Sequence, residues 1–499
     1  MIDAKKIETA VALLKERIGE EKVADELHVR AMYNRDISLY SYDYPIPGII
    51  TYPECTEDVV AIIKTANEVM IPTIVVGAQS YGNGNNDSYG GIVVDMARMN
   101  KILHIDPDNM CFTVEAGANI HATNRVLKKQ GFCYPTYPMG YGPLPFGSEV
   151  SKNSGGEIGS MYGHIHKRLI ALEVVTGAGE VIQTGSSNVL DTNAAYLQSG
   201  FPDLTQLFVG AECAFGIITK VTVSMNLEPY KKCGMDISFP PNEDGFKQCV
   251  AYIQELKNHK GLIANAHLCD FYNSWLAERH LTQNADVSEE AAEAARGHHG
   301  HTAVIEFESF SDDREIEWKK TLALEIAERF GGRDNGEFLA NIFCDMEALQ
   351  TLGYAGGFVG TMIMTNTPYN KLWEMYDNFL HRLDQHGLPQ AHSSFIVACG
   401  DDATIPFYFP WHKLRNESDP DDWDHTIEEW RAMCFELFED SIRIGTMPHS
   451  ISRSWKPYVM DHLEEGYLKY IREVKKVMDP NNIMNPGVSV FEEGDYYVK

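Results

Sequence analysis

The sequence predicts an α+β protein in which two differently patterned regions form separate domains. The first region, from about residue 48 to 225, alternates short β-branched strands with helices and glycine-rich turns. The second region, from about Tyr230, has long amphipathic helices separated by extended segments, which is the pattern of an antiparallel sheet covered by helices. The length of 499 residues is enough for large cores, since a domain averages roughly 150 residues.

Composition restricts the classes of function. The chain has 42 Lys and Arg against 71 Asp and Glu, a formal net charge of −29 at pH 7. This charge repels phosphate groups, so we expect no nucleic-acid partner and no binding to an anionic membrane. The first 22 residues lack the apolar core of a secretory signal, and no stretch has the roughly 18 consecutive apolar residues of a spanning helix. We therefore expect a protein without a membrane span.

The ten cysteines are scattered, and no two of them form a C-x-x-C pair. This spacing argues against an iron–sulfur cluster or a zinc ribbon in the chain. Unpaired thiols are typical of a reducing compartment. We therefore expect a cytoplasmic location.

Regular alternation begins after an amphipathic helix and a polar entry segment in residues 1–46. Residues 49–53 predict a strand, and the next helix begins near Thr56, with two acidic residues in its positively polarised first turn. A buried strand at 73–76 and a glycine-rich loop at 77–84 follow. These elements make a compact β-α-β unit.

Further elements follow along the chain. In the first region we expect a helix at 119–130 and strands at 92–95, 102–105, 112–115, 169–176, 180–183 and 215–223. In the second region we expect helices at 244–258, 317–330, 370–386 and 422–443, and strands at 261–267, 303–308, 358–364 and 394–399. A helix at 464–477 and a turn-rich segment at 479–487 come last.

Three glycine-rich segments carry the candidate binding chemistry. They are residues 77–84, residues 146–156 with 161–163, and residues 207–219. Backbone N–H groups of such loops can hold a pyrophosphate without Lys or Arg, and glycines let the backbone approach a flat ligand closely. Each segment alone also fits a plain structural role: a tight turn, a surface loop, and a helix-to-strand connection with an incidental acid, Glu212.

In this order and spacing the segments resemble the FAD-linked oxidoreductases of the vanillyl-alcohol oxidase / p-cresol methylhydroxylase fold. The pattern is most similar to the glycolate oxidase D-subunits and D-2-hydroxy-acid dehydrogenases. The resemblance is carried by residues 49–53, 76–84, 91–95, 114–117, 147–163, 172–175, 209–219 and 479–487. It implies an α+β FAD-binding domain made from both chain ends, 1–228 (with its core at 48–225) and 444–499, and a cap domain at 229–443 inserted between them.

The resemblance also implies which residues meet FAD. Those expected to wrap the pyrophosphate are Val76, Gly77, Ala78, Gln79, Ser80 and Tyr81. Those expected to line the flavin are Gly147, Ser148, Ser151, Asn153, Gly156, Tyr162 and Gly163, with Gly216 and Ile218 at the nucleotide half and Asn485 closing the site. Several members bind flavin covalently through a loop histidine, but this chain has Gln79 there. We therefore expect non-covalent FAD that denaturation releases.

Departures from the family pattern concern a metal site. The hydroxy-acid branch has H-x-G-D-G-N-x-H in its cap and G-E-H-G near its end, whereas this chain has Ala398, Ile405 and Pro448 at the ligand positions. We therefore expect activity without a divalent metal. The histidine of the last motif is retained as His449, and the resemblance implies that it is the general base. Arg453 could clamp a substrate carboxylate or phenolate, or form a surface ion pair.

His449 is expected to titrate near the usual histidine pKa of about 6.5, which suits proton removal at neutral pH. A histidine packed at the domain seam without chemistry is its plain alternative. The other candidates for the base are Asp401, Asp402, His412, His164 and His166, of which the last two lie beside Lys167 and Arg168 and fit a surface role equally well.

The cap segment at 407–412 is unusually aromatic. Phe407, Phe409 and Trp411 fit either the core of a half-buried strand or a stacking wall for an apolar substrate. Tyr137 and Tyr141, together with Tyr134, allow the same two interpretations.

The sequence therefore predicts an FAD-dependent oxidoreductase that oxidises a C–OH group of a small molecule by hydride transfer to flavin N5, as 2-hydroxy-acid dehydrogenases do. A phenolic or aromatic alcohol oxidase or dehydrogenase is the first alternative. An electron-transfer subunit of a larger complex is the second, and a non-catalytic protein that kept the fold is the third. A small-molecule substrate is the expected partner, with an electron-acceptor protein and homo-oligomers as open options.

Overall fold

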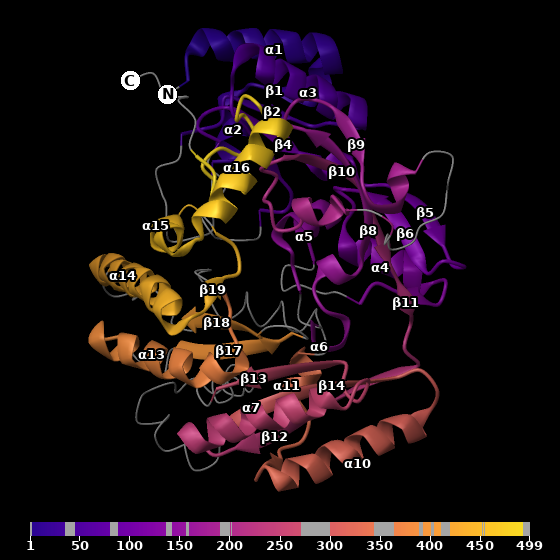
Figure 1. The fold of residues 1–499 in the computed structure, drawn as a ribbon, viewed down its shortest axis with the longest axis vertical. Helices are drawn as coiled ribbons and strands as arrows, with labels where there is room; N and C mark the ends of the chain where they lie inside the picture. The colour runs from indigo at the N-terminus through magenta and orange to yellow at the C-terminus, as the bar shows by residue number, and fades with distance from the viewer. Residues whose placement is uncertain are drawn as a thin grey trace.

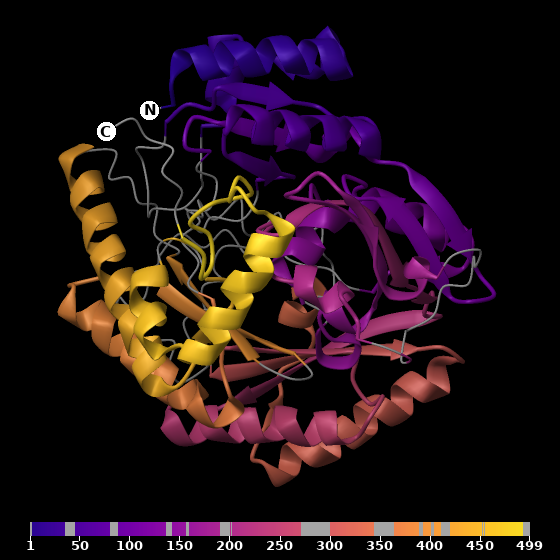
Figure 2. The same cartoon turned by 45° about the horizontal axis from the view of Figure 1, so that its top comes forward.

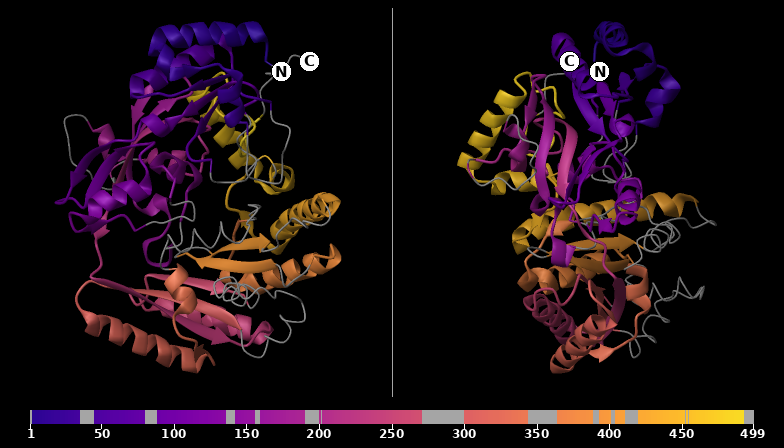
Figure 3. Two further views of the ribbon diagram at one scale, coloured as in Figure 1. Left: turned by 180° about the vertical axis from the view of Figure 1, so that it is seen from behind. Right: turned by 90° about the vertical axis from the view of Figure 1, so that its right-hand side faces the viewer.

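The computed structural model describes residues 2–34, 45–79, 88–135, 142–155, 159–189, 200, 202–270, 300–343, 364–388, 393–400, 404–410, 420–451, 453 and 455–492. At 342, 393, 394, 396, 405–410 and 420–427 it describes the backbone alone. The molecule has two halves, an N-terminal half with two sheets and a second half built around one large sheet (Figure 1). A side view shows the C-terminal helix lying against the N-terminal half (Figure 3).

The first sheet contains the predicted β-α-β unit. Its strands are β1 (Val23–Ala24), β2 (Ile49–Thr51), β3 (Thr73–Val76) and β4 (Ile92–Asp95), in the order β1-β2-β4-β3. Strands β2, β4 and β3 are parallel, so the chain needs the crossover helix α3 (Thr56–Val69) between β2 and β3. Helix α1 (Ala4–Ile18) packs against α3 at the top of the molecule (Figure 1), and α2 (Leu27–Met32) follows β1.

The second sheet is antiparallel, with the order β5-β6-β10-β8-β9. Its strands are β5 (Ile102–Asp106), β6 (Cys111–Glu115), β8 (Leu169–Thr176), β9 (Val181–Gln183) and β10 (Gly216–Ser224). The connection from β6 to β8 contains α4 (Ile120–Lys128), β7 (Phe132–Cys133), α5 (Phe146–Lys152) and α6 (Gly159–Tyr162), and β7 pairs with β11 (Asn226–Leu227). Helices α5 and α6 are each only one or two turns long, too short to give a helical period in the sequence at 133–163.

The second half confirms the predicted antiparallel sheet covered by helices. Its order is β15-β12-β14-β13-β17-β18. The strands are β12 (Lys231–Phe239), β13 (Asn265–Cys269), β14 (His301–Ser309), β15 (Arg333–Asp334), β17 (Ser393–Cys399) and β18 (Thr404–Pro410). Strand β12 was not predicted, because its two lysines and Gly234 hide the alternation of its buried residues. The predicted strand at 358–364 lies outside the described residues except for its last position.

Helices cover one face of this sheet. Side chains of α7 (Glu243–Asn258), α10 (Asp313–Arg329) and α13 (Leu372–Gln385) pack with Ile237, Ile305 and Phe395 in one hydrophobic cluster. The short helix α11 (Phe338–Phe343) lies on the opposite face, where a Cβ on Gly234 would come 2.2 Å from that of Ala340. Figure 2 shows α7 and α10 on the side of the sheet away from the N-terminal half. The other face is therefore the one turned toward that half.

Both chain ends contribute to the core of the N-terminal half. Its cluster runs from Ala10 to Met225 and resumes with Ile483, Met484, Val488, Val490 and Phe491. Trp455, which precedes α15 (Lys456–Val459), and Val459, its last residue, pack instead in the cluster of the second half. The domain ranges 1–228, 229–443 and 444–499 stay a prediction. We propose that the boundary between the second and third ranges lies after Val459.

A buried ion pair fixes the returning tail. Lys475, in α16 (Glu465–Met478), donates from Nζ to Asp479 Oδ2 at 2.5 Å, to the Ala214 carbonyl at 2.6 Å and to the Met484 carbonyl at 2.8 Å. Asp479 also accepts the backbone N–H groups of Ile483 and Met484. Through Lys475 this pair joins the turn at 479–487 to Ala214, in the segment at 207–219.

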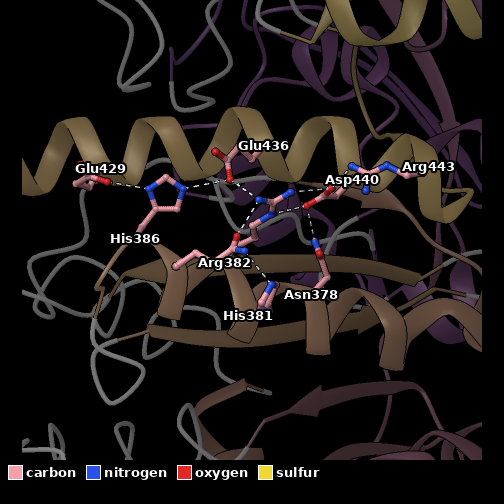
Figure 4. A network of polar contacts seen from close by, with 9 residues as sticks. Asn378, His381, Arg382, His386, Glu429, Glu436, Asp440 and Arg443 are labelled. Carbon is pink, nitrogen blue, oxygen red and sulfur yellow. Dashed lines mark hydrogen bonds and ion pairs between the residues drawn. The ribbon is translucent and has the colours of Figure 1, made fainter.

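A second polar network joins α13 to α14 (Pro420–Ile444) (Figure 4). Arg382 holds Asp440 with Nε and Nη2, at 2.7 and 3.0 Å, and His386 lies between Glu429 at 2.8 Å and Glu436 at 3.2 Å. Helix α14 leads into β19 (Met447–Pro448), which pairs with β16 (Thr365–Asn366), the strand that precedes α13. The network therefore holds together the two helices from which these short strands extend.

Candidate active site

Four segments singled out in the sequence meet in the N-terminal half. The loop after β3 touches the start of α5, since a Cβ on Gly77 would lie 2.2 Å from Ser148 Oγ. The end of α5 touches the segment at 207–219, where the Glu212 N–H donates to the Ser151 carbonyl at 3.0 Å. From the tail, Asn485 donates its Nδ2 to the Glu212 carbonyl at 2.7 Å and its backbone N–H to a carbonyl of β3 at 2.8 Å. The segments therefore form one continuous site.

These segments also hold several backbone conformations that side chains rarely adopt. The φ angles are 50° at Gln79, Asn153 and Glu212, 58° at Cys213 and 39° at Asn485. Non-glycine residues with positive φ are uncommon, and such strain gathers at ligand-binding sites. The loop after β3, the end of α5, the segment at 207–219 and the tail each contribute at least one of these residues.

The residues present fit an FAD. Nε2 of Gln79 and Oδ1 of Asn485 are buried and have no hydrogen-bond partner among the described residues. A buried polar atom without a partner is costly, so such atoms are expected where a bound group supplies the missing hydrogen bond. An amide N–H suits a pyrophosphate oxygen, and an amide oxygen suits an N–H or hydroxyl of the cofactor. Both residues were expected to bind FAD on the basis of the resemblance.

The other residues expected to bind FAD differ in which of their groups a cofactor could contact. Val76 ends β3, next to Gly77 and Ala78, and Gly147 donates its N–H to the Ala116 carbonyl at 2.7 Å. Gly216 begins β10, where a Cβ would come 2.3 Å from the Val175 carbonyl oxygen. The side chain of Ile218 is buried in the core, so its backbone alone is available to a cofactor.

Tyr162 joins the two halves. Its hydroxyl donates to the carboxylate of Glu308 in β14, and Gly163 follows it with φ of 70°. Nearby, the Ser160 hydroxyl donates to the Cys399 carbonyl in β17, and the Met161 N–H donates to the Ala264 carbonyl at 3.1 Å. The segment expected to line the flavin is therefore seated on the face of the large sheet that is turned toward the N-terminal half.

Several candidate residues lie outside the described part of the chain. They are Ser80, Tyr81, Gly156, Tyr137, Tyr141, Trp411, Asp401, Asp402 and His412. Positions 407 and 409 are described by backbone alone, and pair with Ile396 and Ser394 in the antiparallel ladder of β17 and β18. Their register places them on the sheet face opposite to that of Phe395, hence on the face turned toward the N-terminal half.

Tyr134 is a core residue and not part of a substrate wall. Its ring is fully buried against Phe112 and Phe146, and its hydroxyl donates to Glu149 Oε1 at 2.9 Å. Burial raises the pKa of Glu149 well above its usual range, against the opposing effect of this hydrogen bond. The substrate-wall interpretation of Tyr134 is therefore wrong.

His449 lies where the two halves meet. It follows β19, its N–H donates to the Met364 carbonyl at 2.9 Å, and its Nδ1 lies 3.3 Å from Asn366 Oδ1. Burial, followed by the nearby His164 and Lys152, lowers its pKa to about 3. The expected value near 6.5 is therefore corrected: the imidazole is neutral throughout the physiological range.

His164 is buried, contrary to the surface role considered for it. Its ring centroid lies 5.9 Å from that of His449, and 5.9 Å from that of His166 on its other side. Because the chain turns at Gly163, His164 points inward while Lys167 is exposed. Sequence position beside Lys167 and Arg168 could not reveal this, and Arg168 itself is buried.

Sequence reasoning also missed an ion pair beside His449. Lys152 Nζ lies 2.7 Å from Glu212 Oε2, and the other oxygen of Glu212 accepts the hydroxyl hydrogen of Ser450, the residue after His449. The Glu212 side chain is 3% exposed and that of Lys152 is 21% exposed. Glu212 was interpreted as an incidental acid, and no sequence signal linked it to a residue 238 positions away.

Arg453 binds the tail of the chain. Its Nη2 donates to the Pro486 carbonyl at 2.8 Å, and its guanidinium carbon lies 4.7 Å from the ring centroid of Tyr89. Tyr89 donates its hydroxyl to the same carbonyl at 3.2 Å. These contacts give Arg453 a structural role next to Asn485, and a substrate clamp at this residue stays a prediction.

No metal-binding group of three or more His, Cys, Asp or Glu exists within the described ranges. Residues 401–403, which lie between the motif positions Ala398 and Ile405, fall outside those ranges, so metal-independent activity stays a prediction. Within the described ranges, every helix is too short or too polar to cross a bilayer.

Comparisons with known proteins agree with this architecture. Residues 47–185 match a family described as FAD binding domain, and residues 244–488 match one described as FAD linked oxidases, C-terminal domain. The "Glycolate oxidase subunit GlcD" of Bacillus subtilis is 32% identical over 221 residues, which are 43% of this chain and 45% of that protein. The chain therefore matches less than half the length of this relative.

Two further similarities extend over nearly the whole chain. The "D-2-hydroxyglutarate dehydrogenase" of Xanthomonas citri pv. viticola is 28% identical over 472 residues, which are 92% of this chain and 93% of that protein. A solved structure of p-cresol methylhydroxylase with substrate bound is similar with a TM-score of 0.80 over 98% of both chains, at 15% identity. At this identity the structural likeness shows the fold alone.

Proposed function

Because this chain belongs to the FAD-linked oxidases and has the vanillyl-alcohol oxidase / p-cresol methylhydroxylase fold, we propose that it oxidises the C–OH group of a small hydroxy acid. The family, the α+β fold and the FAD cofactor inferred from the sequence are confirmed. The substrate class is supported by the hydroxy-acid enzymes among the relatives. Non-covalent attachment, expected from Gln79, is tested by whether denaturation releases the flavin.

FAD, when bound, supplies the hydride acceptor, so the protein must orient the substrate and remove a proton. His449 has the right protonation state for this task, since its imidazole is neutral. With Nδ1–H directed to Asn366 Oδ1, at 3.3 Å, the Nε2 lone pair is free to accept the hydroxyl proton of the substrate. General-base removal of this proton contributes about 10²–10⁴ to the rate.

The substrate itself can strengthen this base. Lys152 and His164 both disfavour a positive charge on His449. A substrate carboxylate bound near Lys152 would offset that repulsion and raise the pKa of His449, because a nearby anion favours the protonated imidazole. A hydroxy acid therefore suits this site better than a neutral alcohol does.

The position of His449 is the single observation that carries the proposal, since it comes from a late segment of the chain and its ring lies beside His164, which directly follows the segment expected to line the flavin. The test mixes the FAD-loaded protein anaerobically with D- and L-2-hydroxy acids and aromatic alcohols, and follows bleaching of the flavin absorbance. We expect at least one hydroxy acid to bleach the flavin, with or without a chelator. No bleaching by any hydroxy acid would overturn the proposal.

A phenolic or aromatic alcohol is the second candidate substrate. It is supported by the shared fold with p-cresol methylhydroxylase and by the two phenylalanine positions on the inward face of β18. Reduction by aromatic alcohols alone, in the same panel, would favour it.

The cellular setting is also a proposal. No disulfide bond joins any two of the nine described cysteines, which supports a reducing, cytoplasmic location. Steady turnover of the isolated chain with a soluble dye would favour an independent enzyme. Dependence on a copurifying iron–sulfur or flavin protein would favour an electron-transfer subunit, and the homo-oligomeric state is open to light scattering.

A further inference from the structure

Three imidazoles lie in a row at the seam between the halves. The ring of His164 stacks on that of His166 with a centroid distance of 5.9 Å and an interplanar angle of 24°. On its other side, 5.9 Å away and tilted by 36°, lies the ring of His449. His164 is 5% exposed, whereas His166 is partly exposed. The row therefore runs from the proposed base through a buried imidazole to the surface.

The backbone around His164 is shaped to hold its ring. A Cβ on Gly155 would lie 2.4 Å from both Cδ2 and Nε2 of His164, so the ring packs directly on the glycine backbone. The Ile165 N–H donates to the Ser154 carbonyl at 3.1 Å, which closes this turn. At the outer end, His166 Nδ1 lies 3.0 Å from Asn153 Oδ1. Each of the three rings is thus positioned by specific neighbours.

Each oxidation leaves a proton that must depart. When the substrate O–H bond breaks, His449 gains the proton while the hydrogen on the carbinol carbon leaves with its electron pair as hydride. A second turnover requires that the new N–H bond of His449 break. The charged groups near it are Lys152 and, beyond that lysine, Glu212. Lys152 repels a protonated His449, and the pair with Glu212 holds Lys152 in place.

Resting on the proposed function, we propose that His164 and His166 carry the proton taken by His449 to the protein surface. The proton passes from His449 to His164, from His164 to His166, and from His166 to bulk water, and every histidine returns to its neutral form. The 5.9 Å ring spacing exceeds a direct hydrogen bond in the observed orientation, so each transfer uses a ring rotation or one bridging water molecule.

A substrate-independent experiment tests whether His449 and His164 share one proton. The histidines of the FAD-loaded protein are titrated by NMR in the wild type, in His164→Gln and His164→Phe, and in His104→Gln as a control at an exposed site. Because two protonated imidazoles repel one another, we expect His449 to titrate at higher pH in both His164 variants and to be unchanged in the control. An unchanged His449 titration in both variants would overturn the relay, whatever the substrate is.

Proton release tests the direction of transfer. With a pH-indicator dye and weak buffer, anaerobic reduction by a substrate that bleaches the wild-type flavin should release the proton together with bleaching. In His164→Phe, which keeps a flat ring beside His449, release should lag behind bleaching by about tenfold, and added imidazole should remove the lag. A merely structural role would slow both signals equally, without rescue, and would also overturn the relay.

The two tests separate this inference from the proposed function. If no hydroxy acid reduces the flavin, the proposed substrate class fails, while the NMR titration still decides whether the imidazoles are coupled. The dye experiment then uses whichever compound of the panel bleaches the flavin. If proton release keeps pace with bleaching in His164→Phe, the relay is contradicted.

Discussion

The two sides of the site are built from different parts of the polypeptide. The side expected to receive the cofactor depends on backbone conformation: residues with positive φ, such as Gln79 and Asn485, shape its loops, and Gly77 leaves no room for a side chain beside Ser148. The seam side is made of side chains from distant segments, such as Glu212 and Ser450, which are 238 positions apart in the sequence.

This difference explains which parts of the site a sequence can reveal. A backbone-built surface demands particular residue types, glycine above all, at fixed spacing, and leaves a readable motif. A side-chain cluster requires only that polar groups meet, and many residue types at many positions can satisfy that. The proposed base, His449, combines both kinds of construction. A short motif marks it in the sequence, but its neighbours come from distant segments of the chain.

Replacing the proposed base should have the largest effect. In His449→Gln we expect flavin reduction by substrate to slow by about 10²–10⁴, because the proton of the hydroxyl loses its acceptor while FAD binding is unaffected. Anaerobic stopped-flow measurement of flavin bleaching, with flavin content determined beforehand, checks this. His462→Gln, at an exposed position, serves as the control. An unchanged bleaching rate in His449→Gln would remove it from the mechanism.

Filling the space between Gly77 and Ser148 should weaken FAD binding. Gly77→Val would place its Cβ 2.2 Å from Ser148 Oγ and 2.7 Å from Pro145 Cγ. Overpacking of this kind costs about 1–3 kcal/mol, which corresponds to roughly ten- to hundredfold weaker FAD binding. Flavin content after dialysis and the Kd for added FAD measure the effect. Gly200→Ala, where no atom lies within 4 Å of the added Cβ, should bind FAD normally.

If Gly77→Val kept its full flavin content, the loop after β3 would have to be assigned a purely structural role. The two sides of the site would then no longer differ in how much they depend on backbone conformation.

Breaking the seam ion pair should affect stability more than breaking an exposed one. In Lys152→Met the Glu212 carboxylate, 3% exposed, loses its charge partner, and we expect a loss of about 2–4 kcal/mol. Lys247→Met removes a pair with Glu243 in which both side chains are about half exposed, and should cost under about 1 kcal/mol. Urea unfolding of both variants in parallel measures the difference. Equal midpoints would mean that water screens the seam pair as well.

The network between α13 and α14 should give the smallest effect, and one that depends on pH. Burial opposes a charge on His386, but its hydrogen bonds with Glu429 and Glu436 outweigh that effect and raise its pKa. A raised histidine pKa contributes stability that is fully present below the unfolded value of about 6.5 and is lost as pH rises through the folded value. Wild type should therefore lose under about 1 kcal/mol relative to His386→Gln as pH rises from 6 to 8.

Thermal unfolding of wild type and His386→Gln across this pH range checks the last expectation. Parallel curves would show that the pKa of His386 is the same in the folded and unfolded protein, and would contradict the raised value. Flavin reduction should be the same in both proteins at pH 7, since His386 contacts Glu429 and Glu436 of α14 and not the residues around His449.

Much of the fold could be predicted because the hydrophobic periods and helix caps visible in the sequence correspond to strands and helices in the structure. The β-α-β unit, the strands of the second sheet and four of the helices of the second half appear where period and capping signals placed them. Strand β12 escaped because Lys231, Lys232 and Gly234 interrupt its pattern, although Met235, Ile237 and Phe239 alternate into the core. A strand whose first half is polar is recognised only through its partner β14.

The sequence by itself determined the family and the cofactor and predicts the loops that receive it, because each of these depends on glycines and turn residues whose spacing is visible without knowing the fold. Only the tertiary structure decided that Tyr134 is core, that Arg453 binds the tail, and that His164 and the Lys152–Glu212 pair stand beside His449. The physical reason is that burial and charge depend on what arrives from other segments. A histidine next to Lys167 and Arg168 has a polar neighbourhood along the chain, yet its pKa and its partners are decided by residues hundreds of positions away.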